Sequence, residues 1–263
     1  MIIKMKFRTY ILRLYFERHS DFSAFYQVFL EKTYSNLMTK IKQGDIVIDA
    51  GANVGMFTVI ASVLSGADGY VISIEPDPEN LRILKKNIEL NNLKNIEIID
   101  KALYSVSGEK IKLIQNGVMS RISFNDAKSY IAKRIEVETI TFDDIIINRG
   151  LQPTVLKMDI EGAEKYALLG ASTMMKTINY LECEIHSRED YEVLSRFSNF
   201  FYFKKEPIEN MRNVLTFAIK HPIKILKLEY YNKFATTKRI MSSFKSNSGL
   251  SEYPIIVYGE RLT

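Results

Sequence analysis

The 263-residue sequence contains no tryptophan, only three histidines and a single cysteine, Cys183. A lone cysteine excludes an internal disulfide and fits a reducing cytoplasm. No apolar run approaches the ~18 residues that a membrane-spanning helix needs. At the N-terminus, Lys4, Lys6, Arg8 and Arg13 interrupt the chain before a secretory apolar core can form. We therefore expect a cytoplasmic protein rather than a secreted or membrane-spanning one.

The composition is that of a globular chain, with 46% apolar and 25% charged residues, which argues against disorder. The net charge of +5 comes from the flanks, because residues 1–43 carry 8 basic and 3 acidic side chains and residues 204–245 carry 10 and 3. Basic flanks attract nucleic acid, an anionic membrane surface or an acidic substrate. A solvated helix face explains each flank equally well.

Short apolar segments alternate with helical patterns through the middle of the chain, which indicates right-handed βαβ units and a parallel sheet. We predict a Rossmann-like α/β fold with a seven-stranded, mostly parallel sheet and helices on both faces. The expected strands are Ile46–Ile48, Tyr70–Ile74, Asn95–Ile99, Val155–Met158 and Asn179–Ile185, with closing strands at Asn199–Lys204, Val214–Ile219 and Pro254–Tyr258. The expected helices are 54–64, 78–90 and two that start near Thr141 and Gly162.

The segments around this sheet divide the chain into three parts. Residues 1–43 are expected to form a helical N-terminal cap that begins with an amphipathic helix. Residues 44–220 form the main domain, which includes a small β insertion at about 109–140. Residues 221–263 form a basic C-terminal extension, helical from Pro222 to Lys245.

The first candidate site is the turn after the first core strand, Asp49-Ala-Gly51-Ala-Asn53-Val-Gly55. Gly51 can adopt a positive φ and lets a ligand approach the backbone, and the following helix presents free N–H groups. Asn53 replaces the second glycine of the dinucleotide fingerprint, which therefore fails. Asp49 would repel a pyrophosphate but suits the ammonium and sulfonium of S-adenosylmethionine. A purely structural strand-to-helix turn is the alternative.

Acidic residues also end the next two strands. Glu75 lies 20 residues after Gly55, where a carboxylate can accept hydrogen bonds from both ribose hydroxyls. Asp100 ends the third strand and could face the adenine amino group, with Ala102 in the wall of the base pocket. A helix-capping role for Glu75 near Pro78 is the alternative.

Two further clusters fall at the ends of the fourth and fifth strands. Asp159 and Glu161 precede Gly162 and can serve as base and orienting partner or hold a cation, although an acidic helix cap has the same pattern. In the fifth strand, alternation puts Glu184 and His186 on one side. The unperturbed pKa of a histidine, ~6.5, suits a base for a hydroxyl.

These stretches together resemble the FkbM family of class I S-adenosylmethionine-dependent methyltransferases. The matching segments are VIDAGANVGMFT, VISIEPDPENLRILKKNIELNN, VETITFDDII, VLKMDIEGAEKYALLGA and ECEIH, which occur in the family's order over roughly residues 44–190. The resemblance assigns Asp49, Gly51, Asn53, Gly55 and Glu75 to the cofactor motifs, Asp159, Glu161 and Gly162 to a DxEG motif, and Glu184 with His186 to a strand end. It also places a substrate-side loop near Ser120–Phe124.

The resemblance implies O-methylation of a hydroxyl on a sugar, glycan, lipid-linked glycan or other natural product. We expect S-adenosylmethionine as cofactor, with Asp159 also beside the sulfonium. His186 is the leading base, Asp159 is the alternative, and Glu184 or Asp159 could orient the imidazole. A divalent cation at Asp159 and Glu161 is compatible with the sequence but not required.

Three other interpretations remain open at this point. The basic flanks fit an RNA methyltransferase, but the fourth strand ends in DIEG and no RNA-binding module is recognisable, so we do not expect nucleic acid as partner. A catalytically silent cofactor-binding protein is a second alternative. The flanks could also seat the enzyme on an anionic membrane.

Overall fold

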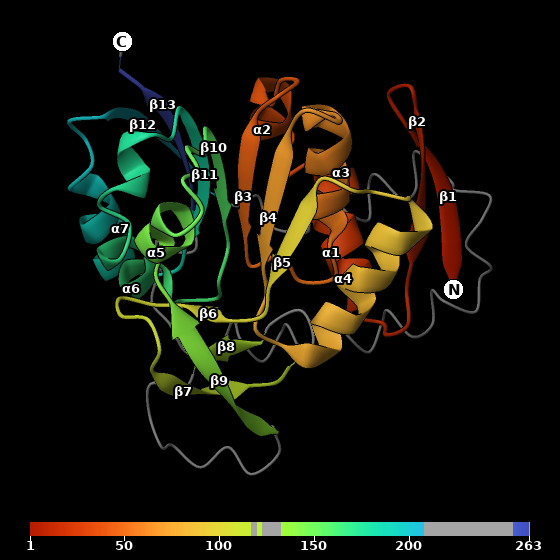
Figure 1. The fold of residues 1–263 in the computed structure, drawn as a ribbon, viewed down its shortest axis with the longest axis horizontal. Coiled ribbons are helices and arrows are strands. Elements are labelled where there is room, and N and C mark those ends of the chain that lie inside the picture. The colour runs from red at the N-terminus through yellow and green to blue at the C-terminus, as the bar shows by residue number, and fades with distance from the viewer. Residues whose placement is uncertain (117–119, 123–132, 208–254, 263) are drawn as a thin grey trace.

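A computed structural model describes residues 1–116, 120–122, 133–207 and 255–262. Its centre is a seven-stranded sheet (Figure 1). In spatial order the strands are β12 (Phe201–Pro207), β13 (Ile255–Arg261), β11 (Tyr180–Ile185), β10 (Val155–Met158), β3 (Ile46–Ala50), β4 (Tyr70–Ile74) and β5 (Ile96–Ile99). Only β13 runs antiparallel to its neighbours, so the predicted mostly parallel, Rossmann-like sheet is confirmed.

The order of the strands reverses between β3 and β10. From β3 the chain proceeds outward through β4 and β5, and it then returns to build β10 and β11 on the other side. Ligands in open α/β sheets bind outside the carboxyl ends of the strands at such a switch point. Most of the candidate site residues lie at the carboxyl ends of β3, β4, β5, β10 and β11 or in the loops that follow them.

Helices cover both faces of the sheet because neighbouring strand residues point to opposite sides. Val47 packs in a cluster with the N-terminal segment and α3, whereas Ile48 packs with α5, α6 and α7. The first face holds α1 (Asp21–Phe25), a π-helical segment (Tyr26–Glu31), α2 (Ser35–Lys40), α3 (Met56–Ser65) and α4 (Pro78–Leu90). The second holds α5 (Phe142–Ile147), α6 (Glu164–Leu169), a 3-10 turn (Met174–Lys176) and α7 (Arg188–Ser195) (Figure 1).

The amphipathic helix expected at the N-terminus is wrong. Residues 2–15 form an antiparallel hairpin of β1 (Ile2–Phe7) and β2 (Tyr10–Tyr15), in which Lys4 pairs with Arg13. Charged and apolar residues alternate here with a period of two, which is the period of a strand, and Leu12 and Leu14 are buried against α4 and its neighbours. Basic residues at every second position from Lys4 to Arg8 therefore indicate a strand rather than a helix.

The insertion forms a second, four-stranded sheet beneath the carboxyl edge of the main sheet (Figure 1). Its strands are β6 (Ala102–Leu103), β9 (Arg134–Ile140), β7 (Lys110–Ile114) and β8 (Arg121–Ile122), in that order. Thr141 caps α5 as expected, because its side chain accepts a hydrogen bond from the Asp144 backbone N–H. Phe124 lies outside the described residues.

The last strand belongs to the main sheet, although it comes from the C-terminal extension. β13 lies between β11 and β12 in the main sheet, although its residues lie beyond the expected domain end at 220. The strand expected at Val214–Ile219 and the helix expected at Pro222–Lys245 fall outside the described residues. Within the described part of the chain, no helix has both the length and the apolar character needed to cross a bilayer.

Candidate active site at the carboxyl edge of the sheet

The turn between β3 and α3 has the backbone that its glycines predict. Gly51, Asn53 and Gly55 have φ values of 75°, 54° and 85°. A Cβ on Gly51 would lie 1.8 Å from the backbone oxygen of Asp159, and a Cβ on Gly55 would lie 2.5 Å from Leu84 Cδ1. No side chain caps α3, so its N-terminal N–H groups face the carboxyl edge as a binding surface.

Asp49 is completely buried at the end of β3. Its Oδ2 accepts a hydrogen bond of 2.6 Å from the Thr58 hydroxyl, and its Oδ1 lies 3.3 Å from Lys157 Nζ. Lys157 also donates to the Gly51 carbonyl at 2.7 Å. Burial lowers the pKa of Lys157, but the charges of Asp49, Asp159 and Glu184, together with the hydrogen bond to Asp49, outweigh burial and the pKa is raised. Asp49 therefore holds the ammonium that braces the turn.

Glu75 lies at the end of β4 and joins the turn to α4. Its Oε2 accepts from the Asn53 N–H at 2.8 Å, and its Oε1 accepts from the Asp77 N–H at 2.9 Å and from Asn80 Nδ2 at 3.3 Å. Burial raises the pKa of Glu75 to about 7, although these three donors oppose the shift. The carboxylate of Glu75 therefore lies against the glycine turn.

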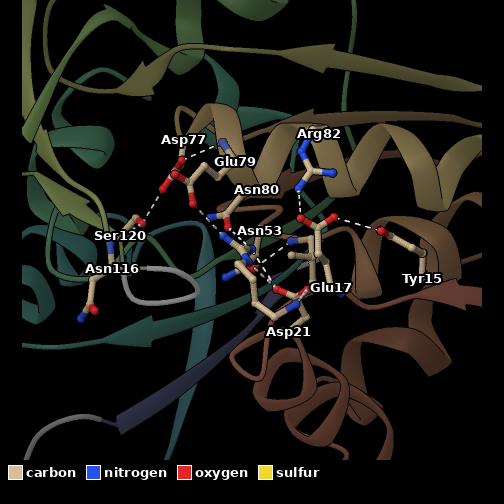
Figure 2. Close-up of polar contacts among 12 residues, drawn as sticks. Tyr15, Glu17, Asp21, Asn53, Asp77, Glu79, Asn80, Arg82, Asn116 and Ser120 are labelled. Atoms are coloured by element: carbon tan, nitrogen blue, oxygen red, sulfur yellow. Dashed lines mark hydrogen bonds and ion pairs between the residues drawn. The ribbon is translucent and has the colours of Figure 1, made fainter. Parts of the chain in front are cut away.

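The N-terminal segment contacts Glu75 indirectly, through Asn80. Arg18 donates to Asn80 Oδ1 at 2.7 Å and pairs with Asp21, while Asn80 in turn donates to Glu75. On the other side, the Ser120 hydroxyl donates to Asp77 Oδ2 at 2.6 Å, so the insertion is tied to the start of α4 (Figure 2). Residues from three distant parts of the chain thus meet around Glu75.

Asp100 and Ala102 lie in different surroundings. Asp100 is exposed after β5 and lines a cavity of about 530 Å³ with Lys101 and Arg149. Ala102 is buried in β6. Their expected roles at the adenine ring remain predictions.

Asp159 lies directly beside the glycine turn, because its N–H donates to the Ala50 carbonyl at 3.1 Å. Its Oδ2 accepts a hydrogen bond of 2.9 Å from the Tyr34 hydroxyl. Glu161 follows with a φ of 53°, unusual for a residue with a side chain. Burial and the charge of Asp159 raise the pKa of Glu161 to about 7.

His186 is surrounded by carboxylates. Its Nδ1 lies 3.1 Å from Glu164 Oε1, and its Nε2 lies 3.5 Å from Glu184 Oε1 and 3.9 Å from Glu161 Oε2. Burial lowers the pKa of His186, but the hydrogen bond and charge of Glu164 and the charges of Asp159 and Glu184 raise it to about 10. Burial and the charge of Asp159 raise the pKa of Glu184 to about 9. The imidazole is therefore protonated near neutral pH, contrary to the ordinary value assumed from the sequence.

Several residues of the site were not identified from the sequence. Lys157 and Glu164 stand inside the LKMDIEGAE motif, but a lysine in a strand and a glutamate at a helix start have common structural explanations. Glu164 is fully buried and also accepts from the Ile160 N–H at 3.1 Å. Tyr34 has no local signal, because its contact with Asp159 spans 125 positions.

Comparison with known proteins identifies the family of this chain. The profile of the FkbM methyltransferase domain matches residues 49–235, which is more than half of the chain. The hexuronic acid methyltransferase AglP of Haloferax volcanii is 23% identical over 158 residues, which cover 59% of this chain and 61% of AglP. A ribosomal protein L11 methyltransferase of Acetivibrio thermocellus is 28% identical over 82 residues, or 31% of this chain and 26% of that protein. The chain thus spans less than two thirds of the length of these relatives.

Two solved structures of methyltransferases are also similar to this chain, both at low TM-scores. A methyltransferase FkbM from Methylobacillus flagellatus has a TM-score of 0.43 at 21% identity and covers 62% of this chain and 40% of that one. A putative rRNA methylase from Clostridium thermocellum has a TM-score of 0.48 at 12% identity and covers 89% and 96%. The family match over residues 49–235 carries the assignment: the chain belongs to the FkbM family of S-adenosylmethionine-dependent methyltransferases.

Proposed function

We propose that this methyltransferase acts on a hydroxyl oxygen of a sugar or glycan. The observation that carries the proposal is the cluster of Asp159, Glu161, Glu184 and His186 beside the glycine turn. Proton-accepting groups next to a methyl donor suit a hydroxyl, which must lose its proton during transfer. The name of AglP, a hexuronic acid methyltransferase, supports a sugar acceptor.

The residues around the turn fit S-adenosylmethionine. The N-terminus of α3 offers N–H donors without a capping side chain, and Glu75 offers a carboxylate at the next strand end. We propose that Glu75 accepts the ribose hydroxyls. Asp49 has no exposed surface, so we propose that it acts through Lys157 and the turn rather than by direct contact with the methionine end.

The bound cofactor supplies an electrophilic methyl carbon on a sulfonium. In transfer, the acceptor oxygen forms the new O–C bond as the C–S bond breaks, and the electron pair of that bond stays on sulfur as a neutral thioether. The chain's own residues hold the acceptor in line and take its proton.

The proton acceptor is a carboxylate in this proposal. His186 holds a proton between Glu164 and Glu184 and therefore acts as a positive positioning group. The Glu161 side chain is 27% exposed, compared with 9% for Glu184, so an entering hydroxyl can reach Glu161. We propose Glu161 as the base, with Asp159 lining the path to the sulfonium.

Transfer of a tritiated methyl group tests this function. The purified chain is incubated with labelled S-adenosylmethionine and a panel of hexuronic acid and neutral hexose glycosides. We expect label in a sugar product that survives mild alkali, because a methyl ether is stable there and a methyl ester is not. Glu161→Gln should lower kcat at least tenfold and leave cofactor affinity unchanged. Alkali-labile label would contradict a hydroxyl acceptor.

Two measurements separate the alternative functions. Cofactor binding without transfer to any acceptor would support a silent binding protein. Filter binding with bulk RNA addresses the nucleic-acid alternative, and strong binding that weakens steeply with salt would favour it.

We also propose that the N-terminal hairpin contacts an anionic membrane surface. Its register places Lys4, Lys6 and Arg13 on one exposed face together with Ile2 and Ile11, which are 51% and 57% exposed. Basic side chains with apolar side chains between them suit a surface of anionic headgroups. Each Lys or Arg contributes about 1 kcal/mol to binding at such a surface.

Sedimentation with vesicles tests this contact. The parent chain should sediment with phosphatidylserine-containing vesicles at low salt and not with neutral ones. The variant with Lys4, Lys6 and Arg13 all changed to Glu should remain in the supernatant. Equal sedimentation of parent and variant would contradict the hairpin as the contact.

A further inference from the structure

Asp159, Glu184 and His186 lie close enough together to share one ligand. Each offers one oxygen or ring nitrogen, and these atoms all lie within 4.8 Å of one another. The residues come from the ends of neighbouring parallel strands, β10 and β11, in which Met158 pairs with Cys183. Two carboxylates and an imidazole are a donor set for a divalent first-row metal ion, since carboxylates suit Mn²⁺ and imidazole suits its later neighbours.

Two of the three side chains are held so that one atom remains for a ligand. Tyr34 donates to Asp159 Oδ2 at 2.9 Å, and Asp159 Oδ1 is buried without a hydrogen-bond partner among the described residues. Glu164 Oε1 lies 3.1 Å from His186 Nδ1, which leaves Nε2 facing Glu184 Oε1 at 3.5 Å. A carboxylate behind the distal ring nitrogen is the usual way in which proteins orient a metal-binding histidine.

Glu184 provides an independent sign of a ligand. The residue is only 7% exposed, and its Oε2 has no hydrogen-bond partner in the part of the chain that the structure describes. A buried carboxylate oxygen without a donor costs free energy unless a cation meets it. The same edge also carries Glu161 and Glu164, so negative charge exceeds the positive charge of His186.

We propose that Asp159, Glu184 and His186 bind one divalent metal ion of the Mn²⁺ class. Binding displaces the protons of His186 and Glu184 to solvent, because a metal ion binds only the neutral imidazole and the ionised carboxylate. The ion then supplies the positive charge that His186 carries in the metal-free chain. A bound ion would lower the pKa of a hydroxyl that coordinates it. The binding site stands independently of the proposed O-methylation, whereas this role in the reaction rests on it.

Mn²⁺ alone, added to the full chain without cofactor, tests the site. Electron paramagnetic resonance should show one bound Mn²⁺ per chain, and its spin-echo modulation should show coupling to a ring ¹⁴N. Glu184→Gln should weaken Mn²⁺ binding at least tenfold, and His186→Gln should also remove the nitrogen coupling. Glu164→Gln should weaken it 10- to 100-fold as a positioning residue, with the coupling altered.

Asp68→Asn is the matched control, because Asp68 is an exposed acid before β4, at the opposite end of the strand. It should bind Mn²⁺ like the parent. The nitrogen coupling is measured on the parent chain, so the test does not depend on a variant that folds poorly. Absence of stoichiometric binding, or bound Mn²⁺ without nitrogen coupling, would overturn the proposal. If S-adenosylmethionine still binds and methyl transfer persists in that case, the proposed function stands and only the metal site fails.

Discussion

We predict that Glu75 makes cofactor affinity depend on pH. Its pKa is raised to about 7 by burial, so the carboxyl is mostly protonated at pH 6 and mostly ionised at pH 8. A protonated carboxyl cannot accept hydrogen bonds from both ribose hydroxyls. The ionised fraction rises from about 9% to about 91% between these pH values for a pKa of 7, so affinity for S-adenosylmethionine should increase about tenfold.

Glu75→Gln is the perturbation that isolates this effect, since the amide keeps the shape and cannot ionise. The affinities of parent and variant are measured by calorimetry at pH 6 and at pH 8. Their ratio at each pH cancels any effect of the protonation of the ligand itself. We expect the affinity ratio of parent to variant to increase about tenfold from pH 6 to pH 8. An affinity ratio that does not change with pH would refute the ribose role of Glu75 or its raised pKa.

The same group affects folding with a definite sign. An unfolded glutamate has its ordinary pKa of 4.5, so between pH 4.5 and 7 the unfolded chain has lost a proton that the folded chain keeps. Protonated Glu75 therefore stabilises the folded chain relative to the ionised form by on the order of 3 kcal/mol. This stabilisation is fully present below pH 4.5 and is lost as the pH rises through 7. Urea unfolding should show this slope in the parent relative to Glu75→Gln, and parallel pH profiles would contradict it.

Three further substitutions follow from the described contacts. Lys157→Met leaves Asp49 buried without its cation and should lower the free energy of unfolding in urea by about 3–5 kcal/mol. Adding Asp49→Asn should recover most of this stability, and if it does not, loss of the ion pair is not the cause. Gly51→Ala should cost at least ~1 kcal/mol for its positive φ alone, with a further loss from the clash with Asp159 and a weaker cofactor affinity by calorimetry; an unchanged melting temperature would contradict this. Thr141→Ala removes the cap of α5 and should cost about 1 kcal/mol, whereas Thr141→Ser should be nearly neutral in the same thermal unfolding assay.

Local pattern was sufficient for the sheet and for the ligand edge. Pro78–Leu90 forms the expected helix, and Val155–Met158 forms the expected strand. Gly51 and Glu75 follow buried strands at the predicted positions. These features depend on residue type and spacing along a few neighbouring positions, which is the information that periodicity carries.

The N-terminal segment shows where pattern was not sufficient. The hairpin of its first 15 residues agrees with their alternation, but the contacts of Arg18 with Asn80 and of Tyr34 with Asp159 have no such local signal. Both contacts join residues far apart in the sequence, 62 and 125 positions. No local spacing encodes such a contact, so only the folded chain reveals that the segment is part of the site.

The sequence by itself determined that the chain is an α/β methyltransferase and which strand ends carry polar groups. The tertiary structure decided their chemical state. It enclosed Asp49 with Lys157 and surrounded His186 with carboxylates, so that the pKa of the histidine rises to about 10. The reason is physical: proton affinity depends on burial and on charges from other strands and helices, and these are set only when distant parts of the chain pack together.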